Sequence, residues 1–377
     1  MSIPISQLVE FTEAALAADY GRLRKVGQQM AREMEVADQD GARRFRLTLN
    51  RKGVPLQASG FSEMLPVDSK SRLPLIEEHP WPSVPVFLDA NGQEKFEAFI
   101  TDVNNFDLLA SKGIASKLSL MLSGPPGTGK TLLAGHIASQ LGRKLYVARL
   151  DSVISSMLGD TAKNIRSIFD FIAGKNAVLF LDELDAVAKM RDDRNELGEL
   201  KRVVNTVIQG VDSLDDRAIV IAATNHAQML DKAIWRRFHY KIDFDPPDFD
   251  LRQALWLHFL GNEEGLGLAV QILANLSEGL SGAEIEQYAF ATRRLSVLTG
   301  QALNTIALAD TIACRGVVQG ERASTRSSDV RRNLAHILVK QHHVSQIDVA
   351  RFLGITRQAV STYLKGANDA KQQSTHS

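Results

Sequence analysis

The segment "GPPGTGKT" at residues 124–131 contains residue types that can together bind phosphate groups. Its glycines let backbone N–H groups turn inward around an anion, and the helix expected to follow adds the positive end of its dipole. Lys130 can reach the outer phosphates of a nucleotide, and the Thr131 hydroxyl can bind magnesium. A plain strand-to-helix turn would need the glycines but neither Lys130 nor Thr131. The segment therefore predicts a P-loop with the nucleotide-binding residues Gly124, Pro125, Pro126, Gly127, Thr128, Gly129, Lys130, Thr131 and Leu132.

A second segment with chemical potential is "AVLFLDELD" at residues 177–185, an apolar run that ends in carboxylates. A buried strand that ends in Asp182 would place this carboxylate at the sheet edge beside the P-loop, where it can hold the magnesium shell. Glu183 leaves the sheet edge in another direction, which suits a carboxylate that orients and polarises the attacking water. For Asp185 the sequence favours a structural role, the capping of a helix after the strand.

Both segments lie in a region where short β-rich runs alternate with helical stretches. Nearly continuous apolar strands separated by helices indicate an α/β domain, with a parallel sheet covered on both faces. After "DPPD" at 245–248 the pattern becomes helical, which predicts a second, all-helical unit. The predicted strands are 118–123, 144–150, 177–182, 218–225 and 240–244.

The N-terminal part differs in composition from this region. Apolar residues at helical spacing predict a small helical bundle over residues 1–52. Residues 53–92 hold six of the chain's eleven prolines, which exclude long helices and indicate an extended connector. We expect this connector to dock through Phe61, Leu65, Trp81 and Phe87. The predicted divisions are a helical bundle (1–52), a Pro-rich connector (53–92), an α/β part (93–246), a helical part (247–320), a C-terminal helical part (325–366) and a polar tail (367–377).

The overall composition excludes several classes of protein. Lys plus Arg and Asp plus Glu number 44 each, so any contact with nucleic acid has to come from a local patch. The single cysteine, Cys314, cannot form an internal disulfide, and its apolar surroundings indicate a small packing residue. The N-terminus does not resemble a signal peptide, and no run of about 18 apolar residues is present. The sequence therefore predicts a soluble, cytoplasmic protein that does not contact a membrane.

Five motifs in a fixed order, "GPPGTGKT", "LFLDELD", "IAATN", "LDKAIWRRF" and "LSGAEI", resemble those of the AAA family of ATPases, over roughly residues 93–315. The resemblance implies a P-loop NTPase fold, with a five-stranded parallel sheet followed by a helical lid. It also implies that ATP is hydrolysed with Mg²⁺, and that ATP binds between neighbouring subunits of a homo-oligomeric ring, which we expect to be a hexamer.

The resemblance assigns further roles by position. Asn225 looks like sensor 1, a polar side chain that positions the attacking water. Arg236 and Arg237 match arginine fingers, which a neighbouring subunit supplies, and "RRF" is most similar to the katanin and spastin group; a solvated surface pair is the alternative. His258, Gly282 and Ala283 match lid residues that face the adenosine, although a lone helical histidine is more often a packing residue.

One segment departs from the family pattern. "SSMLGDTAKNIRSIF" aligns with the first pore loop, where ring translocases commonly carry an aromatic residue. Here Met157 takes that position, followed by Leu158 and Gly159. Methionine is apolar and adaptable, so gripping a polypeptide stays compatible with this sequence. The alternative is a plain loop before a helix that starts near Thr161.

The C-terminal segment "QIDVARFLGITRQAVSTYL" resembles a helix-turn-helix of the phage-repressor type, preceded by a helix near 329–341. Gly354 would form the turn, and Thr356 would cap the second helix. Residues 321–366 hold eight basic side chains against three acidic ones, a balance that suits contact with phosphates. The alternative is a helix-turn-helix used for protein packing. The residues expected to face DNA are Thr356, Arg357, Gln358, Ser361 and Thr362.

Two hypotheses about function follow from these modules. The first is an ATP-driven remodeller or translocase of a protein client, acting as a ring, with the N-terminal helices selecting a client or a separately encoded partner enzyme. The second is a nucleotide-switched DNA-binding regulator in which hydrolysis resets the assembly. In both, Lys130, Glu183, Asn225, Arg236 and Arg237 carry the reaction, and Thr131 and Asp182 hold the metal.

Overall fold

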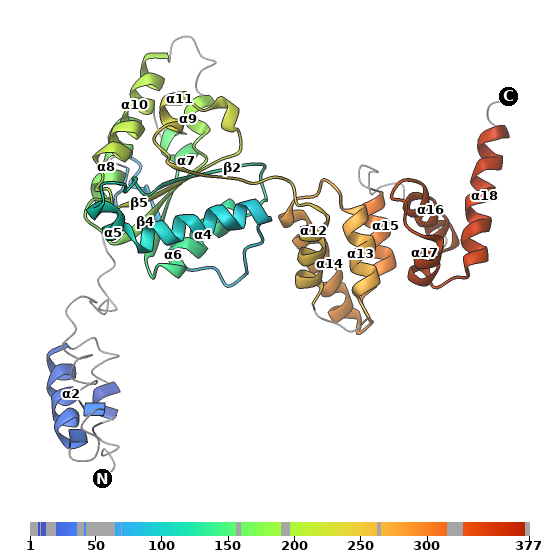
Figure 1. Cartoon of the computed structure of the whole chain (residues 1–377), viewed down its shortest axis with the longest axis horizontal. Helices are drawn as coiled ribbons and strands as arrows, with labels where there is room; N and C mark the ends of the chain where they lie inside the picture. Colours follow the sequence, from blue (N-terminus) through green and yellow to red (C-terminus); the bar gives the residue numbers. More distant parts are fainter. Residues whose placement is uncertain are drawn as a thin grey trace. The chain divides into compact units, whose positions relative to one another are not determined.

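The structure is a computed structural model that describes residues 7, 9–12, 20–35, 41–42, 65–68, 70–155, 160–189, 197–261, 265–314 and 327–373. The chain forms two compact units, Met1–Met64 and Leu65–Ser377. The longest described element of the smaller unit is helix α2 (Tyr20–Glu35), which buries Val26, Met30 and Ala31 along one face (Figure 1). This spacing is the helical one expected from the sequence.

The larger unit contains a sheet of six strands in the order β1-β3-β4-β5-β2-β6. Five of them, β2 to β6, run parallel to their neighbours in this group. They confirm the five predicted strands, with ends that differ by at most one residue. Their bounds are β2 (Ser119–Ser123), β3 (Lys144–Arg149), β4 (Ala177–Asp182), β5 (Ile219–Thr224) and β6 (Tyr240–Asp243).

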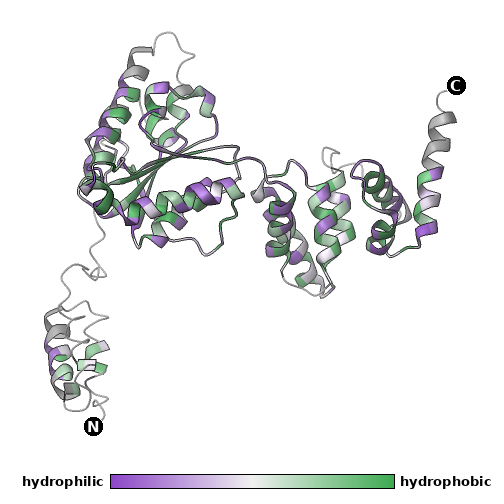
Figure 2. Ribbon diagram, in the orientation of Figure 1, coloured by the Kyte–Doolittle hydropathy of each residue, from purple (hydrophilic) through white to green (hydrophobic). Residues whose placement is uncertain are grey.

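Successive residues of the strands enter different hydrophobic cores, because side chains alternate between the two faces of a sheet. On β5, for example, Ile219 and Ile221 pack with the core under α4 and α6, whereas Val220 packs with the core under α7, α8 and α10. Figure 1 shows these groups of helices on opposite sides of the sheet, and Figure 2 shows the strands between them as hydrophobic. The helices are α4 (Ala90–Asn104), α5 (Phe106–Ser111), α6 (Lys130–Gln140), α7 (Leu150–Ser155), α8 (Thr161–Ile172), α9 (Ala186–Lys189), α10 (Leu197–Ser213) and α11 (Lys232–Trp235), with the 3-10 helix η2 (Ala227–Met229).

The sixth strand, β1 (Glu77–His79), lies in the predicted extended connector and adds an edge to the five parallel strands expected from the sequence. It pairs antiparallel with β3 at the edge of the sheet. Its sequence, Glu-Glu-His, has no apolar alternation, so the pairing depends on backbone hydrogen bonds. Two expected docking residues have contacts: Trp81 Nε1 donates to the Arg143 carbonyl at 3.0 Å, and Phe87 packs against the Phe259 ring.

Before β1, the connector forms a tight turn closed on Asp68 and packs against α8. Asn164 Nδ2 donates to Asp68 Oδ2 at 2.6 Å, and both side chains are buried. Backbone N–H groups of Ser71 and Lys70 donate to Asp68 Oδ1. The Ser71 bond, followed by the Asn164 bond, holds the pKa of Asp68 well below its ordinary value. Leu65 packs on the adjacent core, whereas the expected docking residue Phe61 lies outside the described residues.

Four helices follow the sheet, as the sequence predicts. Ser281 and Glu284 form a capping box that starts α14, and the buried Trp256 on α12 donates from Nε1 to Ser277 Oγ at 2.9 Å. The helices are α12 (Phe249–Leu260), α13 (Gly267–Leu276), α14 (Gly282–Thr299) and α15 (Thr305–Ala313).

The C-terminal helices α16 (Ser327–Lys340), α17 (Gln346–Leu353) and α18 (Arg357–Gln373) share one hydrophobic core with these four helices. Gly354 ends α17 in the left-handed conformation, with φ of 64°, and Thr356 Oγ1 accepts from the Ala359 N–H at 3.2 Å. α17 also contacts α13, and α16 contacts α15. Across the described part of the chain, none of the helices has the length and apolar character needed to cross a membrane.

Candidate active site

The loop predicted to bind phosphates runs from the end of β2 to the start of α6, and its three glycines all have positive φ, so none of them can be replaced without strain. Gly124 has φ of 144°, and a Cβ at this position would lie 2.2 Å from the Phe244 carbonyl oxygen. Gly127 has φ of 75°, and a Cβ there would lie 2.9 Å from Ser281 Oγ on the lid side. Because glycine has no side chain, the backbone N–H groups of this loop can approach an anion closely.

Lys130, the first residue of α6, is a buried cation in this loop. Its Nζ donates to the carbonyl oxygens of Gly124 and Pro125, both at 2.7 Å. Burial lowers the pKa of Lys130, while the nearby Asp182 and Asp185 oppose this shift. A partly desolvated cation interacts more strongly with an anion than a cation in bulk water does, so this position is suited to phosphate.

The carboxylates after β4 lie beside the P-loop as the sequence predicts. Thr131 Oγ1 lies 3.4 Å from Asp182 Oδ2, so a hydroxyl oxygen and a carboxylate oxygen lie next to each other. Oxygen ligands of this kind suit Mg²⁺, which usually keeps several waters and substrate phosphates as its other ligands. Among the described residues, no cluster of three or more His, Cys, Asp or Glu side chains could hold a metal ion.

Glu183 follows Asp182 in a backbone conformation that is uncommon for a residue other than glycine. Its φ is 54°, and its N–H donates to Asp182 Oδ1 at 2.9 Å. Such conformations cost on the order of 1–3 kcal/mol and occur often at functional sites. The Glu183 side chain is exposed and lines the site.

Asp185 has contacts that the sequence did not indicate. Its buried Oδ1 accepts from Thr224 Oγ1 and from the Asn225 N–H, both at 3.2 Å. These bonds join the loop after β4 to the end of β5 and fix the backbone of Asn225. Asn225 Oδ1 is buried and has no hydrogen-bond partner among the described residues. A buried polar atom without a partner is costly, so this atom marks a position where a polar ligand or water would fit.

Most of the predicted site residues line one cavity of about 660 Å³ in the larger unit. The lid contributes Gly282 and Ala283, and the Ala283 N–H donates to the Gly127 carbonyl at 3.1 Å. Gly124 and Pro125 do not line the cavity; their carbonyls hold Lys130 instead. The predicted site residues that line it are Pro126, Gly127, Thr128, Gly129, Lys130, Thr131, Leu132, Asp182, Glu183, Asn225, Gly282 and Ala283.

Part of the cavity wall was not predicted from the sequence. Residues 84–88 of the connector and residues 243–248, which begin with the last residue of β6, line it, together with Phe259 on α12. His136 Nε2 lies 2.7 Å from the Val84 carbonyl oxygen and holds the connector on α6. Apolar side chains in this wall suit the flat face of a nucleotide base. The apolar run "VPVFL" before α4 was the available signal.

His258 is not among the residues that line the cavity, so its position beside the adenosine stays a prediction. On α12, Leu251, Leu255 and Phe259 line the cavity at helical spacing, and His258 is one position out of phase. Its exposed ring packs 5.4 Å from the Phe87 ring, a packing role that the sequence had left open.

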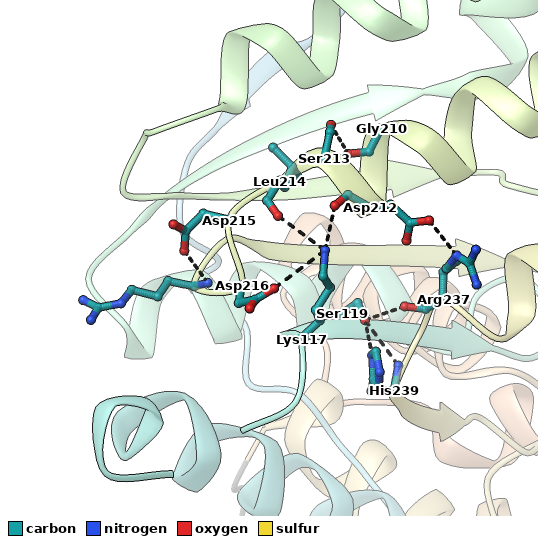
Figure 3. Close-up of polar contacts among 11 residues, drawn as sticks. Lys117, Ser119, Gly210, Asp212, Ser213, Leu214, Asp215, Asp216, Arg237 and His239 are labelled. Carbon is teal, nitrogen blue, oxygen red and sulfur yellow. Dashed lines mark hydrogen bonds and ion pairs between the residues drawn. The ribbon is translucent and has the colours of Figure 1, made fainter. Parts of the chain in front are cut away.

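The two arginines predicted as fingers lie at the end of α11 and do not line the cavity of their own chain. Arg236 is exposed, whereas Arg237 Nε donates to Asp212 Oδ2 at 2.9 Å (Figure 3). The predicted pore-loop residues Met157, Leu158 and Gly159 lie outside the described residues, and the helix after them starts at Thr161 as expected.

The residues predicted to face DNA lie at the start of α18 or just before it. Thr356, Arg357, Gln358 and Thr362 are exposed, and Ser361 is half-buried. Val360 and Leu364 of the same helix point into the shared core and are buried. The polar face is therefore open, while the opposite face holds the helix on its neighbours.

Comparison with known proteins agrees with this geometry. Residues 120–246 match the family model described as ATPase family associated with various cellular activities (AAA). The chain is 40% identical over 163 residues to the uncharacterized AAA family ATPase y4kL of Sinorhizobium fredii, covering 43% of this chain and 49% of the relative. It is 31% identical over 222 residues to 26S proteasome regulatory subunit 6A of Saccharomyces cerevisiae, covering 57% and 51%. The chain thus spans about half the length of these curated relatives.

A solved structure extends the likeness beyond the sheet. The FIGL-1 AAA domain, crystallised in complex with ADP, superposes with a TM-score of 0.52 at 22% identity, covering 70% of this chain and 92% of that chain. At this identity the likeness concerns the fold. The larger unit therefore contains the α/β P-loop fold of an AAA ATPase domain.

Proposed function

We propose that this protein hydrolyses ATP to ADP and phosphate as a ring-forming AAA ATPase, with Mg²⁺ as its metal. The observation that carries the proposal is the convergence in one cavity of a desolvated Lys130, the carboxylates of Asp182 and Glu183, and Asn225 Oδ1, which no described residue bonds. Backbone from the lid closes the same cavity at Ala283.

Each side chain has a distinct task in the proposed reaction. Lys130 neutralises charge on the outer phosphates, and Thr131 and Asp182 hold the metal, which when bound stabilises charge on the phosphate oxygens. Glu183 orients the attacking water and accepts its proton. Asn225, fixed through Asp185, orients the same water and the γ-phosphate. Stabilising the charge that develops in the transition state needs a further cation.

That cation comes from a second copy of the chain. Arg236 and Arg237 lie outside their own cavity, which supports donation to a neighbouring one. A head-to-tail interface of this kind closes into a ring when the rotation between copies allows it. We propose a hexamer, as the resemblance to AAA proteins implies.

The test of hydrolysis is the Glu183→Gln variant measured beside the wild-type chain. We expect Mg²⁺-dependent phosphate release from the wild type. We expect a loss on the order of 100-fold or more in the variant, with ATP affinity retained, because general-base assistance contributes about 10²–10⁴-fold. Unchanged turnover in Glu183→Gln would refute the role of this residue and the proposed chemistry.

The proposed use of the hydrolysis is the remodelling or translocation of a protein client. Relatives named as proteasome regulatory subunits and an ATP-dependent zinc metalloprotease FtsH of Petrotoga mobilis support this use. The N-terminal helices are proposed to select the client or a separate partner enzyme. Glu183→Gln loaded with ATP in cells should retain the client, and recovery of the same proteins with a Lys130 variant would argue against an ATP-dependent grip. The cytoplasmic location stays a prediction.

A second proposed function is DNA binding by a helix-turn-helix formed by α17 and α18. It is supported by the open polar face with Arg357, Gln358 and Thr362, on a helix that Thr356 caps. In a ring, several such faces would bind one DNA molecule with increased avidity. Deleting residues 325–377 would uncover the core shared with the lid, so gel shifts need point variants at exposed positions instead.

A further inference from the structure

A polar network joins the end of α10 to the strand that leads into the P-loop (Figure 3). Lys117 Nζ donates to the carbonyls of Asp212 at 2.8 Å and Leu214 at 3.4 Å. It also lies 3.7 Å from Asp216 Oδ1. A lysine that binds the last carbonyls of a helix fixes its C-terminal turn. Lys117 therefore holds in place the helix turn that carries Asp212.

Arg237 is held in this network by both its side chain and its backbone. Its Nε donates to Asp212 Oδ2 at 2.9 Å, and its carbonyl accepts from Ser119 Oγ at 2.7 Å. The His239 N–H donates to the same hydroxyl at 3.2 Å. Ser119 is the first residue of β2, whose other end opens into the P-loop. The network thus connects the arginine segment to the strand that carries the nucleotide loop of the same chain.

Arg236 has a different environment, although it is the adjacent residue. It caps α11, and its N–H donates to the Lys232 carbonyl at 3.1 Å. Its side chain is exposed, and no residue that the structure describes gives its guanidinium a hydrogen bond or an ion pair. Of the two arginines, Arg236 is therefore the one whose charge is available to another molecule.

We propose that the two arginines divide the work: Arg236 enters the neighbouring copy's cavity as the finger, and Arg237, held by Asp212, is the positioning residue that aims it. This inference rests on the proposed hydrolysis between two copies of the chain. It replaces two equivalent fingers by one cation that contacts phosphate and one ion pair that fixes the backbone beside it. Asp212 then becomes a residue on which the reaction depends, although it lies outside the cavity.

The test compares four variants by steady-state ATP hydrolysis and thermal unfolding. Arg236→Ala should lower kcat by about 100-fold or more and leave KM for ATP within about threefold, because an arginine finger acts in the transition state. Arg237→Ala and Asp212→Asn should each lower kcat by about tenfold. The double variant of these two should lose no more than either one, because both changes break the same pair.

Charge exchange separates positioning from direct contact with phosphate. In Asp212→Arg/Arg237→Asp the ion pair is reversed, and we expect kcat within about threefold of wild type. An aspartate at position 237 cannot neutralise phosphate, so rescue excludes direct action by Arg237. Failure of rescue together with a loss in Arg237→Ala as large as that in Arg236→Ala would overturn the proposal, as would wild-type activity in Asp212→Asn.

A control and a separate outcome keep this test apart from the proposed function. Asp107→Asn removes another exposed ion pair, with Arg217 at 2.6 Å, and should leave kcat unchanged. If the wild-type chain does not hydrolyse ATP, or if Arg236→Ala/Arg237→Ala hydrolyses it at the full rate, the proposed reaction between copies fails. If that double variant is inactive but the single variants are equal, the division of work alone fails.

Discussion

The nucleotide cavity and the C-terminal helices use opposite designs. The cavity assembles side chains from the connector, the P-loop, the ends of β4 and β5 and the lid. It buries a cation and an amide oxygen that has no hydrogen-bond partner in the described part of the chain. The polar face of α18 comes from one helix, and Arg357, Gln358 and Thr362 on it are exposed. Function in the first region depends on side chains that come together from several segments. In the second region it depends on the surface of one helix.

This difference determines which changes are informative in each region. In the cavity, one side chain can abolish chemistry while the fold persists, because the surrounding elements have their own hydrophobic cores. The C-terminal face can be changed residue by residue. Its helices, however, share a core with the lid, so their removal would affect both regions.

Lys130→Met should have the largest effect on the cavity side. At about 4 Å and an effective dielectric constant of about 20, one cation–anion interaction is worth about 4 kcal/mol, which corresponds to roughly 1,000-fold in ATP affinity. The free energy of unfolding should not fall by a similar amount, because the substitution removes a charge whose desolvation is unfavourable. The same desolvation lowers the pKa of Lys130. Calorimetric titration with ATP and thermal unfolding without it measure the two effects. Retained affinity would contradict a phosphate role for Lys130.

Leu353→Ala tests whether the two regions are structurally joined. Leu353 on α17 is fully buried in the shared core, and its truncation should lower the free energy of unfolding by about 2–5 kcal/mol. Trp256, buried on α12, reports on the lid, so its fluorescence in a Trp81→Phe/Trp235→Phe background should show the loss. An unchanged Trp256 transition would mean that the C-terminal helices unfold independently.

Asn225→Ala should separate chemistry from binding in the cavity. We expect kcat to fall by about 10- to 100-fold, on the order of 1.4–2.7 kcal/mol, with ATP affinity within a few-fold, because the amide acts on water and the γ-phosphate. Asn275→Ala is the matched control, since its amide donates to the Gln271 carbonyl on its own helix. A loss of ATP affinity with kcat unchanged would assign Asn225 to binding alone.

Arg357→Ala should have the smallest effect, on the exposed side. If α18 reads DNA, the loss is about 1–3 kcal/mol for a base contact, or a reduced salt dependence for a phosphate contact. Gel shifts with Arg357→Ala beside Arg294→Ala, an exposed arginine on α14, measure it. Equal DNA affinities for both variants and the wild type would mean that α18 does not bind DNA, and would favour its role in packing.

The sequence predicted elements whose signals are local. The five parallel strands followed from continuous apolar runs, and the lid from its helical pattern after residues 245–248. The P-loop, Asp182 and Glu183 lie together because each follows directly from the end of a strand. Edge strand β1 could not be predicted, since "EEH" pairs through its backbone.

Features that depend on packing between distant segments were not predictable. The bonds of Asp185 to β5 and the wall at 84–88 arise only when the sheet is assembled. Motif position likewise does not fix the rotation of α12, which places Leu251, Leu255 and Phe259 on the cavity wall. The core shared by α13 and α17 likewise joins segments that no spacing rule connects.

The most direct test of the account mixes two inactive variants. Glu183→Gln keeps its arginines but lacks the base, and Arg236→Ala/Arg237→Ala keeps its cavity but lacks the donated cation. If each reaction centre combines one copy's cavity with another copy's arginine, the mixture should hydrolyse ATP well above either variant alone. A mixture as inactive as its components, or full activity of the double arginine variant by itself, would contradict this account.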